Sequence, residues 1–576
     1  MSALNLLKQQ GFSTLACQFA EYISRQNNRD DALLVLTAGL LSESVSDGHV
    51  CLNLLAEQPW PSEILQQLPD AATWQKQLAD TEVVGKPAEF KPLILTDDGR
   101  LYLNRYWQDE QHVASAIRQR ALPLVDSPDE TILKSFFSEW QQAVPGVDWQ
   151  KVAVLSALTQ QLTVISGGPG TGKTTVVLKL LQALNLSAPN LRIALAAPTG
   201  KAAARLATVV SETSEIITAK TLHRLLGISQ RQPDGRFNAD NPLPLDVLII
   251  DEASMIDISL MALTLNALPV HARLILLGDA DQLASVESGA VLASLCQQSP
   301  SFTNNFLQLA KQAADLNISD ETGGSPLENC LVKLQHSYRF AAESHIGQLA
   351  AAVRDGQAEV AMTLLQQTNG TLLPADTAQI EQTLMNGYQE FISAVDADQS
   401  AVAVLEAFEK FRLLAAMKNG PNSVAAVNHL MQALLARRGW RTGQQFYHGR
   451  PILITQNHYR LNLFNGDTGV VLRHPDGSLQ ACFMFAGELR WVPLSRLPVH
   501  ETVFAMTVHK SQGSEFESVA LLLPEQDNAL MSRELVYTAL TRARQQLLLM
   551  ADEQILRLAI HRQHQRESGL ADAIAK

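Results

Sequence analysis

The feature that most restricts how this chain can fold is a glycine-rich turn at residues 167–174, Gly-Gly-Pro-Gly-Thr-Gly-Lys-Thr. It matches the pattern G-x-x-x-x-G-K-[ST] and lies between a strand-like apolar run at 162–166 and a helix-forming run at 175–184. Glycines let backbone N–H groups turn inward around phosphate oxygens, and the following helix adds a favourable dipole. This context predicts an ATP-binding loop rather than a glycine turn without a ligand. The residues expected to bind ATP are Gly167, Gly168, Pro169, Gly170, Thr171, Gly172, Lys173, Thr174 and Thr175.

A second stretch supplies the acidic groups that ATP hydrolysis needs. Four branched apolar residues at 247–250 are followed by Asp251 and Glu252. We expect Asp251 to bind Mg²⁺ together with the hydroxyl of Thr174, while Lys173 contacts the β- and γ-phosphates. Glu252 can orient or deprotonate the attacking water. An acidic pair at a strand end can instead cap a helix, but the presence of the phosphate loop upstream in the same chain favours a catalytic role.

Three further polar residues are candidates for the γ-phosphate. Gln282 follows a strand-like run at 274–277, although a loop amide is the simpler interpretation of that residue alone. Arg339 and Arg542 lie far away in the sequence, and guanidinium groups stabilise the charge that develops on the γ-phosphoryl group. Most arginines are surface charges. If these two come from a second α/β unit, ATP lies between two domains and its hydrolysis moves them.

The spacing of apolar runs predicts several domains. Short branched runs alternate with helical stretches after residue 148 and recur at 519–523 and 547–550, which is typical of buried parallel strands in two α/β sheets. Turn signals at 449–451, 465–467 and 475–477 indicate a small β-barrel. The expected units are an N-terminal domain at 1–112, a connector at 113–147, a first sheet domain at 148–333, a second at 334–445 and 499–576, and an inserted barrel at 446–498.

Bulk composition excludes few functions. The chain has 576 residues, 46% of them hydrophobic and 18% charged, which is globular and too long for one core. The net charge of −13 disfavours a simple nucleic-acid-coating protein but leaves room for a local basic channel. The five cysteines form no CxxC pair, and no apolar run approaches the roughly 20 residues that span a bilayer. We therefore expect a cytoplasmic protein without a membrane segment.

An ordered set of motifs runs along the chain, at Gln150, 167–174, 197–203, 221–225, 251–254, 278–283, 337–340, 507–516 and 537–544. This set resembles the motifs of the superfamily 1 helicases, and within them the RecD family, the α subunits of exodeoxyribonuclease V (the RecBCD enzyme). The resemblance extends through 48–52, 101–105 and 463–469, and so covers nearly the whole chain. It implies two RecA-like parallel-sheet motor domains, a helical N-terminal domain and an inserted SH3-like barrel. It also implies Gln150 as an adenine contact. The residues implied to face DNA, or to couple DNA to ATP, are Thr199, Lys201, His223, Thr507, His509 and Lys510.

The family implies a 5′→3′ single-strand translocase that unwinds duplex DNA within a heterotrimer for double-strand break repair. The chain offers no clustered carboxylates of a nuclease, so that activity is expected in a partner subunit, with the N-terminal domain as docking surface. Residues 227–244 are a candidate hairpin that splits the duplex, or an idle surface loop. His509 can alternatively be a core histidine and Lys510 a plain surface cation.

Three rival functions stay open. The first is a self-sufficient RecD-like helicase, which gel filtration with partners distinguishes. The second is a P-loop ATPase that remodels protein, which single-stranded DNA would not stimulate. The third is a structural subunit with a spent ATPase, disfavoured because every catalytic position is filled.

Overall fold

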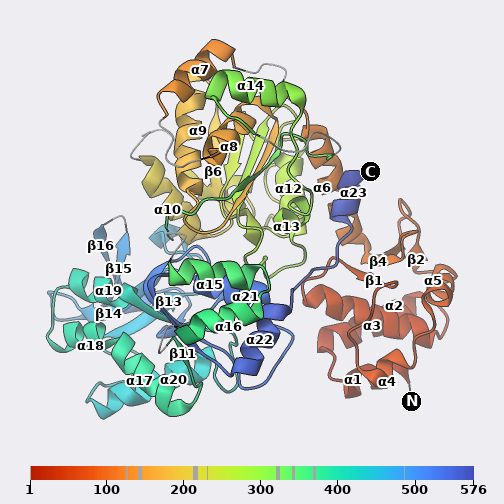
Figure 1. Ribbon diagram of the computed structural model, residues 1–576. Helices are drawn as coiled ribbons and strands as arrows, with labels where there is room; N and C mark the ends of the chain where they lie inside the picture. The colour runs from red at the N-terminus through yellow and green to blue at the C-terminus, as the bar shows by residue number, and fades with distance from the viewer. Residues whose placement is uncertain are drawn as a thin grey trace.

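The computed structural model describes residues 2–124, 128–140, 146–211, 218–229, 231–318, 325–339, 344–367, 371–485 and 487–576. Figure 1 shows three lobes, namely the N-terminal domain in red and two larger lobes that each contain a parallel sheet. The segment that carries the C-terminus runs back from one sheet-containing lobe to the N-terminal domain.

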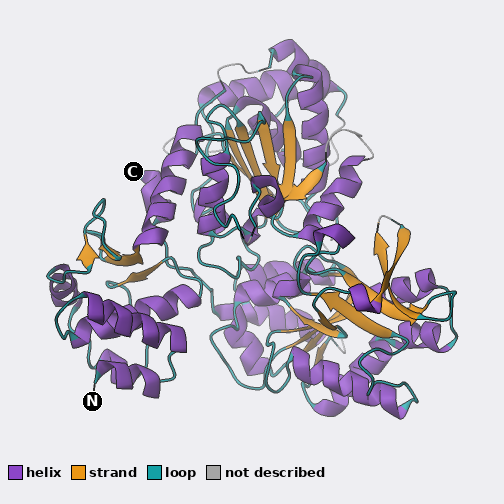
Figure 2. Cartoon of the chain, turned by 180° about the vertical axis from the view of Figure 1, so that it is seen from behind, coloured by secondary structure: helices purple, strands orange, loops and turns teal. Residues whose placement is uncertain are grey.

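The first motor domain is built on a six-stranded parallel sheet with the order β10-β5-β9-β8-β6-β7. All residues of β5 and β8 are buried because helices cover both faces (Figure 2). The strands are β5 Leu162–Gly167, β6 Ile193–Ala197, β7 Ala219–Thr221, β8 Val247–Ile250, β9 Arg273–Gly278 and β10 Leu331–Leu334. The helices are α8 Trp149–Thr159, α9 Lys173–Ser187, α10 Gly200–Ser211, α11 Leu222–Leu226, η1 Ala253–Met255, α12 Ile258–Ala267, α13 Val291–Leu295 and α14 Asn304–Ala314.

The second motor domain has a five-stranded parallel sheet with the order β11-β20-β19-β12-β18. Its strands are β11 Leu372–Leu373, β12 Phe411–Ala415, β18 Ala505–Thr507, β19 Phe516–Leu522 and β20 Ala543–Met550. Its helices are α15 His345–Arg354, α16 Ala358–Gln367, α17 Thr377–Gly387, α18 Gln389–Asp396, α19 Ala401–Lys410, α20 Val424–Arg437, η4 His509–Ser511, α21 Arg533–Leu540 and α22 Glu553–His561. The expected pair of parallel-sheet motor domains is confirmed.

The inserted unit is an antiparallel sheet with the order β16-β15-β14-β13-β17 and a small apolar core of its own. Its elements are β13 Arg450–Ile454, η2 Tyr459–Leu461, β14 Thr468–Arg473, β15 Leu479–Phe485, β16 Glu488–Pro493, η3 Leu494–Arg496 and β17 His500–Thr502. Because β17 pairs with β13, the sheet extends beyond the expected boundary at 498. Its Phe464 packs on the start of α10, since a Cβ at Gly200 would lie 2.3 Å from the Cβ of Phe464.

The N-terminal domain is mainly helical, as the resemblance implies, and it also contains a small sheet. Besides five helices it contains a mixed sheet with the order β1-β4-β3-β2. Its strands have only two to four residues, too few for a visible alternation of apolar and polar residues. The elements are α1 Ala3–Gln9, α2 Thr14–Gln26, α3 Ala32–Ser46, β1 Cys51–Asn53, α4 Ser62–Leu65, α5 Ala71–Ala79, β2 Val84–Gly85, β3 Leu93–Leu95 and β4 Arg100–Leu103.

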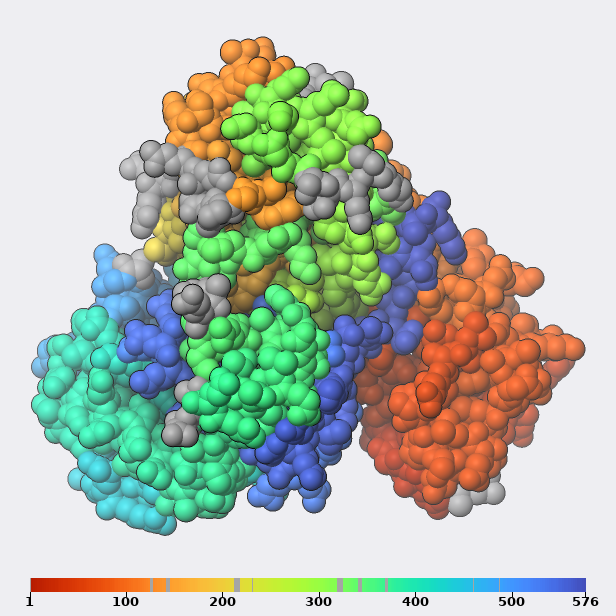
Figure 3. All heavy atoms as spheres, in the orientation of Figure 1, coloured from red at the N-terminus to blue at the C-terminus, as the bar shows by residue number. Residues whose placement is uncertain are grey.

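The expected boundary at 112 falls inside a continuous helix, α6 Asn104–Arg120, which contacts α12 of the first motor domain. No proline or glycine interrupts α6, so a change of composition near its middle does not end it. The rest of the connector contains α7 Glu130–Ser138. The last helix, α23 Leu570–Ala575, packs on α6, and Figure 3 shows this C-terminal segment in blue beside the N-terminal domain.

The candidate hairpin at 227–244 is wrong for the described part of that segment, 227–229 and 231–244. Two isolated bridges, Ser229 with Gln232 and Asn238 with Asn241, replace a ladder of paired strands. The N–H group of Arg236 donates to the carbonyl of Leu226 at 2.8 Å, so the segment folds back on α11 instead of projecting. The proline–aspartate–glycine turn forms, but local backbone hydrogen bonds take the groups that a hairpin would pair.

All five cysteines are free thiols. In the described part of the chain, no helix combines the length and apolar character needed to cross a membrane.

Candidate nucleotide and DNA site

The candidate phosphate loop connects β5 to α9. Gly172, at φ +83°, ends the loop immediately before Lys173, the first residue of α9. The ammonium of Lys173 folds over the loop and donates to the carbonyl oxygens of Gly167 at 2.5 Å and Gly168 at 3.2 Å. The loop thus places a cation and the free N–H groups of a helix N-terminus at the carboxyl end of β5, as phosphate binding requires. The next two residues of α9 are the half-buried Thr174 and the exposed Thr175.

Side chains from outside the loop hold its shape. The buried amide of Gln150 donates to the carbonyl of Thr171 at 2.9 Å, and a Cβ at Gly172 would lie 2.1 Å from the Gln150 amide nitrogen. The hydroxyl of Ser337 donates to the carbonyl of Pro169 at 3.1 Å. Gln150 therefore lies against the loop, and its contact with adenine stays a prediction.

Arg339 reaches the loop from the segment that joins the two sheets. The N–H group of Tyr338 donates to the carbonyl of Gly170 at 2.7 Å. A Cβ at Gly170 would lie 2.2 Å from the Cβ of Arg339. The arginine is therefore adjacent to the loop that carries Lys173. Phe340, the last residue of this motif, lies outside the described residues.

The acidic pair lies at the carboxyl end of β8. Glu252 has φ +54°, and its N–H group donates to the carboxylate of Asp251 at 2.9 Å. Burial, and then the charge of Glu252, raise the pKa of Asp251 to about 6, while Lys173 and Arg205 oppose the rise. Neither acid caps a helix, since Asp257 caps α12 and η1 has no side-chain cap. A half-buried carboxylate with a raised pKa beside a second acid favours a divalent cation.

Gln282 does not stand alone in the site. Its side-chain amide donates to the carboxylate of Asp279 at 2.9 Å, and the hydroxyl of Tyr537 donates to the same oxygen at 3.2 Å. Burial raises the pKa of Asp279. The Tyr537 hydroxyl also lies over the loop, 2.9 Å from where a Cβ of Gly168 would stand. Sequence reasoning missed Asp279 and Tyr537, although both lie inside motifs that it used.

The next residue of this motif joins the two motor domains directly. The N–H group of Leu283 donates to the hydroxyl of Thr538 in α21 at 2.9 Å. Its carbonyl accepts a hydrogen bond from the side-chain amide of Gln512 at 2.7 Å. Both partners belong to the second motor domain, so the loop after β9 is bound to it through one residue's backbone.

Arg542 is buried at the end of α21. Its guanidinium donates to the carbonyl of Thr538 at 3.1 Å and to that of Ser514 at 3.2 Å. Burial lowers its pKa, and the charges of Glu252 and then Glu515 oppose this shift most strongly. Arg542 is thus held rigidly within electrostatic reach of the first domain's acid pair.

Three predicted DNA residues lie on the first motor domain. The hydroxyl of Thr199 accepts the N–H group of Ala202 at 3.3 Å and begins α10. Burial lowers the pKa of Lys201. The charges of Glu409, in the second motor domain, and Asp467, in the inserted unit, oppose this shift. His223 is exposed on α11.

The other three lie on the second motor domain. The hydroxyl of Thr507 accepts the N–H group of Lys510 at 3.3 Å, and the Lys510 ammonium donates to Glu501 at 2.5 Å. His509 is half-buried, and burial followed by the nearby charge of Arg566 lowers its pKa. The structure therefore gathers the predicted ATP residues in one place but distributes the predicted DNA residues over two domains.

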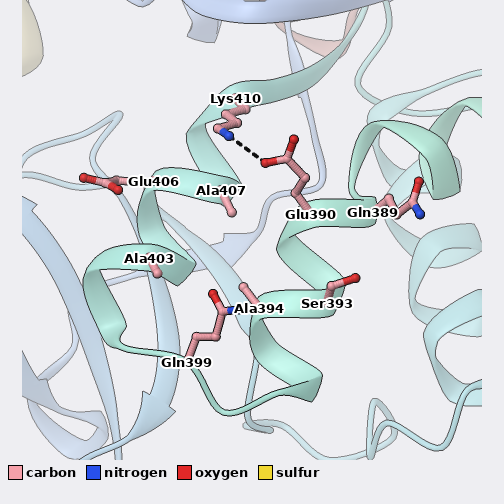
Figure 4. A pocket seen from close by; sticks show the side chains of 9 residues that line it. All are labelled: Gln389, Glu390, Ser393, Ala394, Gln399, Ala403, Glu406, Ala407 and Lys410. Carbon is pink, nitrogen blue, oxygen red and sulfur yellow. Dashed lines mark hydrogen bonds and ion pairs between the residues drawn. The ribbon is translucent and has the colours of Figure 1, made fainter.

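A surface depression between α18 and α19 is a separate feature (Figure 4). It is lined by residues such as Gln389, Ala403 and Glu406, and it holds an ion pair between Lys410 and Glu390 at 2.6 Å. Both partners of that pair are exposed to solvent. The described residues that line the depression include none of the predicted site residues, so we assign no function to it.

Three family models match the chain. An AAA domain matches residues 150–288, the N-terminal domain of the RecBCD enzyme subunit RecD matches residues 8–102, and a UvrD-like helicase C-terminal domain matches residues 502–550. Among solved structures, a Bacteroides Pif1 helicase in complex with ADP-AlF3 and single-stranded DNA overlaps 69% of this chain and 90% of its own. The TM-score is 0.37 at 17% identity, too low to bear on function.

Similar proteins match almost end to end. The RecBCD enzyme subunit RecD of Mycobacterium tuberculosis is 38% identical over 94% of this chain and 91% of its own length. That of Haemophilus influenzae is 36% identical over 82% of this chain and 80% of its own. The ATP-dependent RecD2 DNA helicase of Deinococcus radiodurans is 31% identical over 83% of this chain but only 59% of its own length. With the phosphate loop and the two motor sheets described above, these matches show that the chain belongs to the family of RecD subunits of the RecBCD enzyme.

Proposed function

We propose that this protein is an ATP-dependent 5′→3′ DNA helicase and single-strand translocase, the motor subunit of a RecBCD-type helicase–nuclease for double-strand break repair. One observation carries the proposal. Tyr338 and Arg339, in the segment that leads into the second motor domain, contact the phosphate loop. So does Tyr537, which belongs to the second motor domain itself. A nucleotide in the loop therefore touches both sides of the domain junction, and its hydrolysis can change how they meet.

The residues of the loop fit a nucleotide with Mg²⁺. Gln150 and Arg339 approach Gly172 and Gly170 so closely that no Cβ would fit, and glycine at both positions permits the left-handed backbone of a phosphate loop. The half-buried Asp251, with its raised pKa, is a carboxylate that gains from a divalent cation. Thr174 and Asp251 would hold Mg²⁺, which when bound neutralises charge on the phosphates.

The remaining groups divide the chemistry of hydrolysis. Lys173 would leave the loop carbonyls for the phosphate oxygens, and Glu252 would take a proton from the attacking water. Arg339 and Arg542 would stabilise the charge that develops on the γ-phosphoryl group. Gln282, which is hydrogen-bonded to Asp279, would contact the γ-phosphate. Its neighbour Leu283 is hydrogen-bonded to the second motor domain, so the presence of the γ-phosphate would affect how the two domains meet.

The DNA strand would run across both motor domains. Hydroxyls and cations at Thr199, Lys201, His223, Thr507 and Lys510 suit sequence-independent contacts with a phosphate backbone. His509 faces the C-terminal segment and would act through it rather than by direct contact with DNA.

The partners would be two other subunits, one of which carries the nuclease. The N-terminal domain, which projects from the motor domains in Figure 1, is the proposed docking surface. A cytoplasmic location is part of the proposal and is supported by the five free cysteines.

An unwinding assay on duplexes with 5′ or 3′ single-stranded tails tests the proposal. The wild type should unwind only the 5′-tailed duplex, and Lys173→Gln should lose both ATP hydrolysis and unwinding because the β- and γ-phosphates lose their cation. Lys179→Gln, which removes a lysine from the same helix at a site near Trp140, is the matched control and should retain both activities. Unwinding by Lys173→Gln at the wild-type rate would contradict the proposal.

A self-sufficient helicase is the second candidate, and the match to RecD2 favours it. The extent of the matches nevertheless favours the subunit, because RecD subunits are covered over 80% and 91% of their length and RecD2 over only 59%. Gel filtration of the chain with candidate partner subunits separates the two, since a subunit co-elutes with its partners.

A further inference from the structure

Glu515 collects three arginines from both motor domains. It lies just before β19, and its carboxylate is only 9% exposed. Arg205 of α10 donates to one of its oxygens at 2.9 Å, and Arg339 donates to the same oxygen at 2.6 Å. Arg544 of β20 donates twice to the other oxygen, at 3.1 and 3.0 Å. The arginine pairs hold the pKa of Glu515 at about 2 despite its burial.

The three arginines connect different parts of the machinery. Arg339 lies against the phosphate loop at Gly170. Arg205 lies on α10, which follows Thr199 directly and contains Lys201, two of the proposed DNA contacts. Glu515 therefore stands between the DNA-facing helix of one domain and the γ-phosphate arginine.

The division of the two carboxylate oxygens allows an exchange. Arg339 shares its oxygen with Arg205, and Arg544 occupies the other oxygen. If Arg339 moves to a phosphate, Glu515 keeps two guanidinium partners and is not left as a buried, unpaired charge, which would be costly. A shift of α10 moves Arg205 and so changes how firmly the shared oxygen holds Arg339.

We propose that Glu515 is a positioning residue that holds Arg339 for the γ-phosphate, and that its pair with Arg205 transmits the occupancy of the DNA site to ATP hydrolysis. This inference rests on the proposed function, because it assumes that α10 contacts DNA. The new element is that Glu515 and Arg205, which contact neither ATP nor DNA, determine how strongly DNA stimulates ATP hydrolysis.

The test measures kcat and KM for ATP with and without an oligothymidylate strand. The stimulation factor is the ratio of the two kcat values. Arg205→Gln and Glu515→Gln should each lower this factor about tenfold, roughly the effect of one lost charge-assisted contact on a barrier, with KM for ATP nearly unchanged. The double variant should be no worse than either single variant, since both break one connection.

Arg205→Lys, which keeps the charge, should recover part of the stimulation. The control is Arg192→Gln, which removes an arginine of the same domain from a comparable pair with Asp246 at 2.8 Å, away from the loop. It should leave the stimulation factor at the wild-type value. Thermal melting of each variant shows whether it is folded. If Glu515→Gln does not fold, the stimulation factor of Arg205→Gln is sufficient for the test.

Three results separate the possibilities. Equal stimulation of Arg205→Gln and wild type overturns the inference, and so do effects of the two variants that multiply in the double variant. A wild type that DNA does not stimulate at all contradicts the proposed function instead. An unchanged stimulation factor with a raised KM would assign Glu515 to nucleotide binding and would also overturn the relay.

Discussion

Two carboxylates of the site have pKa values shifted in opposite directions from the ordinary values of their residue types. The pKa of the half-buried carboxylate of Asp251 is raised to about 6, whereas that of Glu515, whose side chain is 9% exposed, is lowered to about 2. The difference comes from their neighbours. Asp251 faces another acid, while Glu515 faces three guanidinium groups. The fold thus concentrates negative charge where a cation is needed and neutralises it where the domains meet.

Replacing Asp251 by Asn should stabilise the protein and abolish ATP hydrolysis. The folded pKa of Asp251 lies above its usual value of 3.8, so its contribution to stability is complete below that value and is lost as the pH rises through about 6. At about pH 8 the variant should therefore unfold at a higher temperature than wild type, by an effect of up to about 3 kcal/mol. Calorimetry across pH measures this, and a gain that does not shrink near about pH 4 would contradict the explanation.

At the scale of elements, the loop between β5 and α9 is shaped by a neighbour that is distant in sequence. Gly170 has φ +75°, and its backbone carbonyl accepts the N–H group of Tyr338. The segment 337–339 is thereby seated on the loop. Any side chain at Gly170 would meet Arg339 as well as adopt a left-handed backbone conformation.

Gly170→Ala should impair ATP hydrolysis more than its backbone strain explains. A left-handed alanine costs about 1–2 kcal/mol, and the methyl group would also stand 2.2 Å from the Cβ of Arg339. Gly439→Ala is the matched control, because Gly439 has φ +93° and nothing within 4 Å of the added carbon. In denaturant unfolding we expect Gly170→Ala to lose more stability than Gly439→Ala, because only its methyl group meets Arg339, and we expect kcat to fall only for Gly170→Ala. Equal kcat values would show that Arg339 is not seated by this contact.

At the scale of the whole molecule, the C-terminal segment binds the three lobes together. The guanidinium of Arg566 donates to the carbonyl of Gly289 at 2.8 Å, to that of Glu287 at 2.6 Å, and also to that of Ser285. Beside it, the N–H group of Val50 donates to the carbonyl of Glu567 at 2.8 Å. Two adjacent residues near the end of the chain, Arg566 and Glu567, thus join the first motor domain to the N-terminal domain (Figures 1 and 3).

Arg566→Ala should loosen the N-terminal domain. Hydrogen bonds from a charged group contribute about 1.5–3 kcal/mol each, and this variant removes several at one junction. Limited proteolysis should then cleave between the N-terminal domain and the motor domains faster than in wild type. Arg562→Ala is the control, because Arg562 binds Asp527 and nearby carbonyls within the second motor domain. Similar cleavage of both variants would argue against a clamp at Arg566.

The local sequence determined the elements that can be recognised from a few consecutive residues. The run at 247–250 is β8 to the residue, and the glycine-lysine-threonine pattern alone located the turn into α9. These elements are visible in sequence because burial on both faces demands continuous apolar residues and a phosphate loop demands glycine. The short strands β1 to β4 and the strand β12, which follows α19 without a break, carry no such signal.

The tertiary structure alone decided which residues meet. Arg205 and Glu515 are 310 positions apart, Leu283 and Thr538 are 255 apart, and no spacing rule links either pair. It also decided that 227–244 folds back on α11 and that α6 continues past residue 112. Sequence patterns report the environment of one element, whereas partners across a domain junction depend on how whole sheets pack, which is set by the sum of contacts over the entire chain.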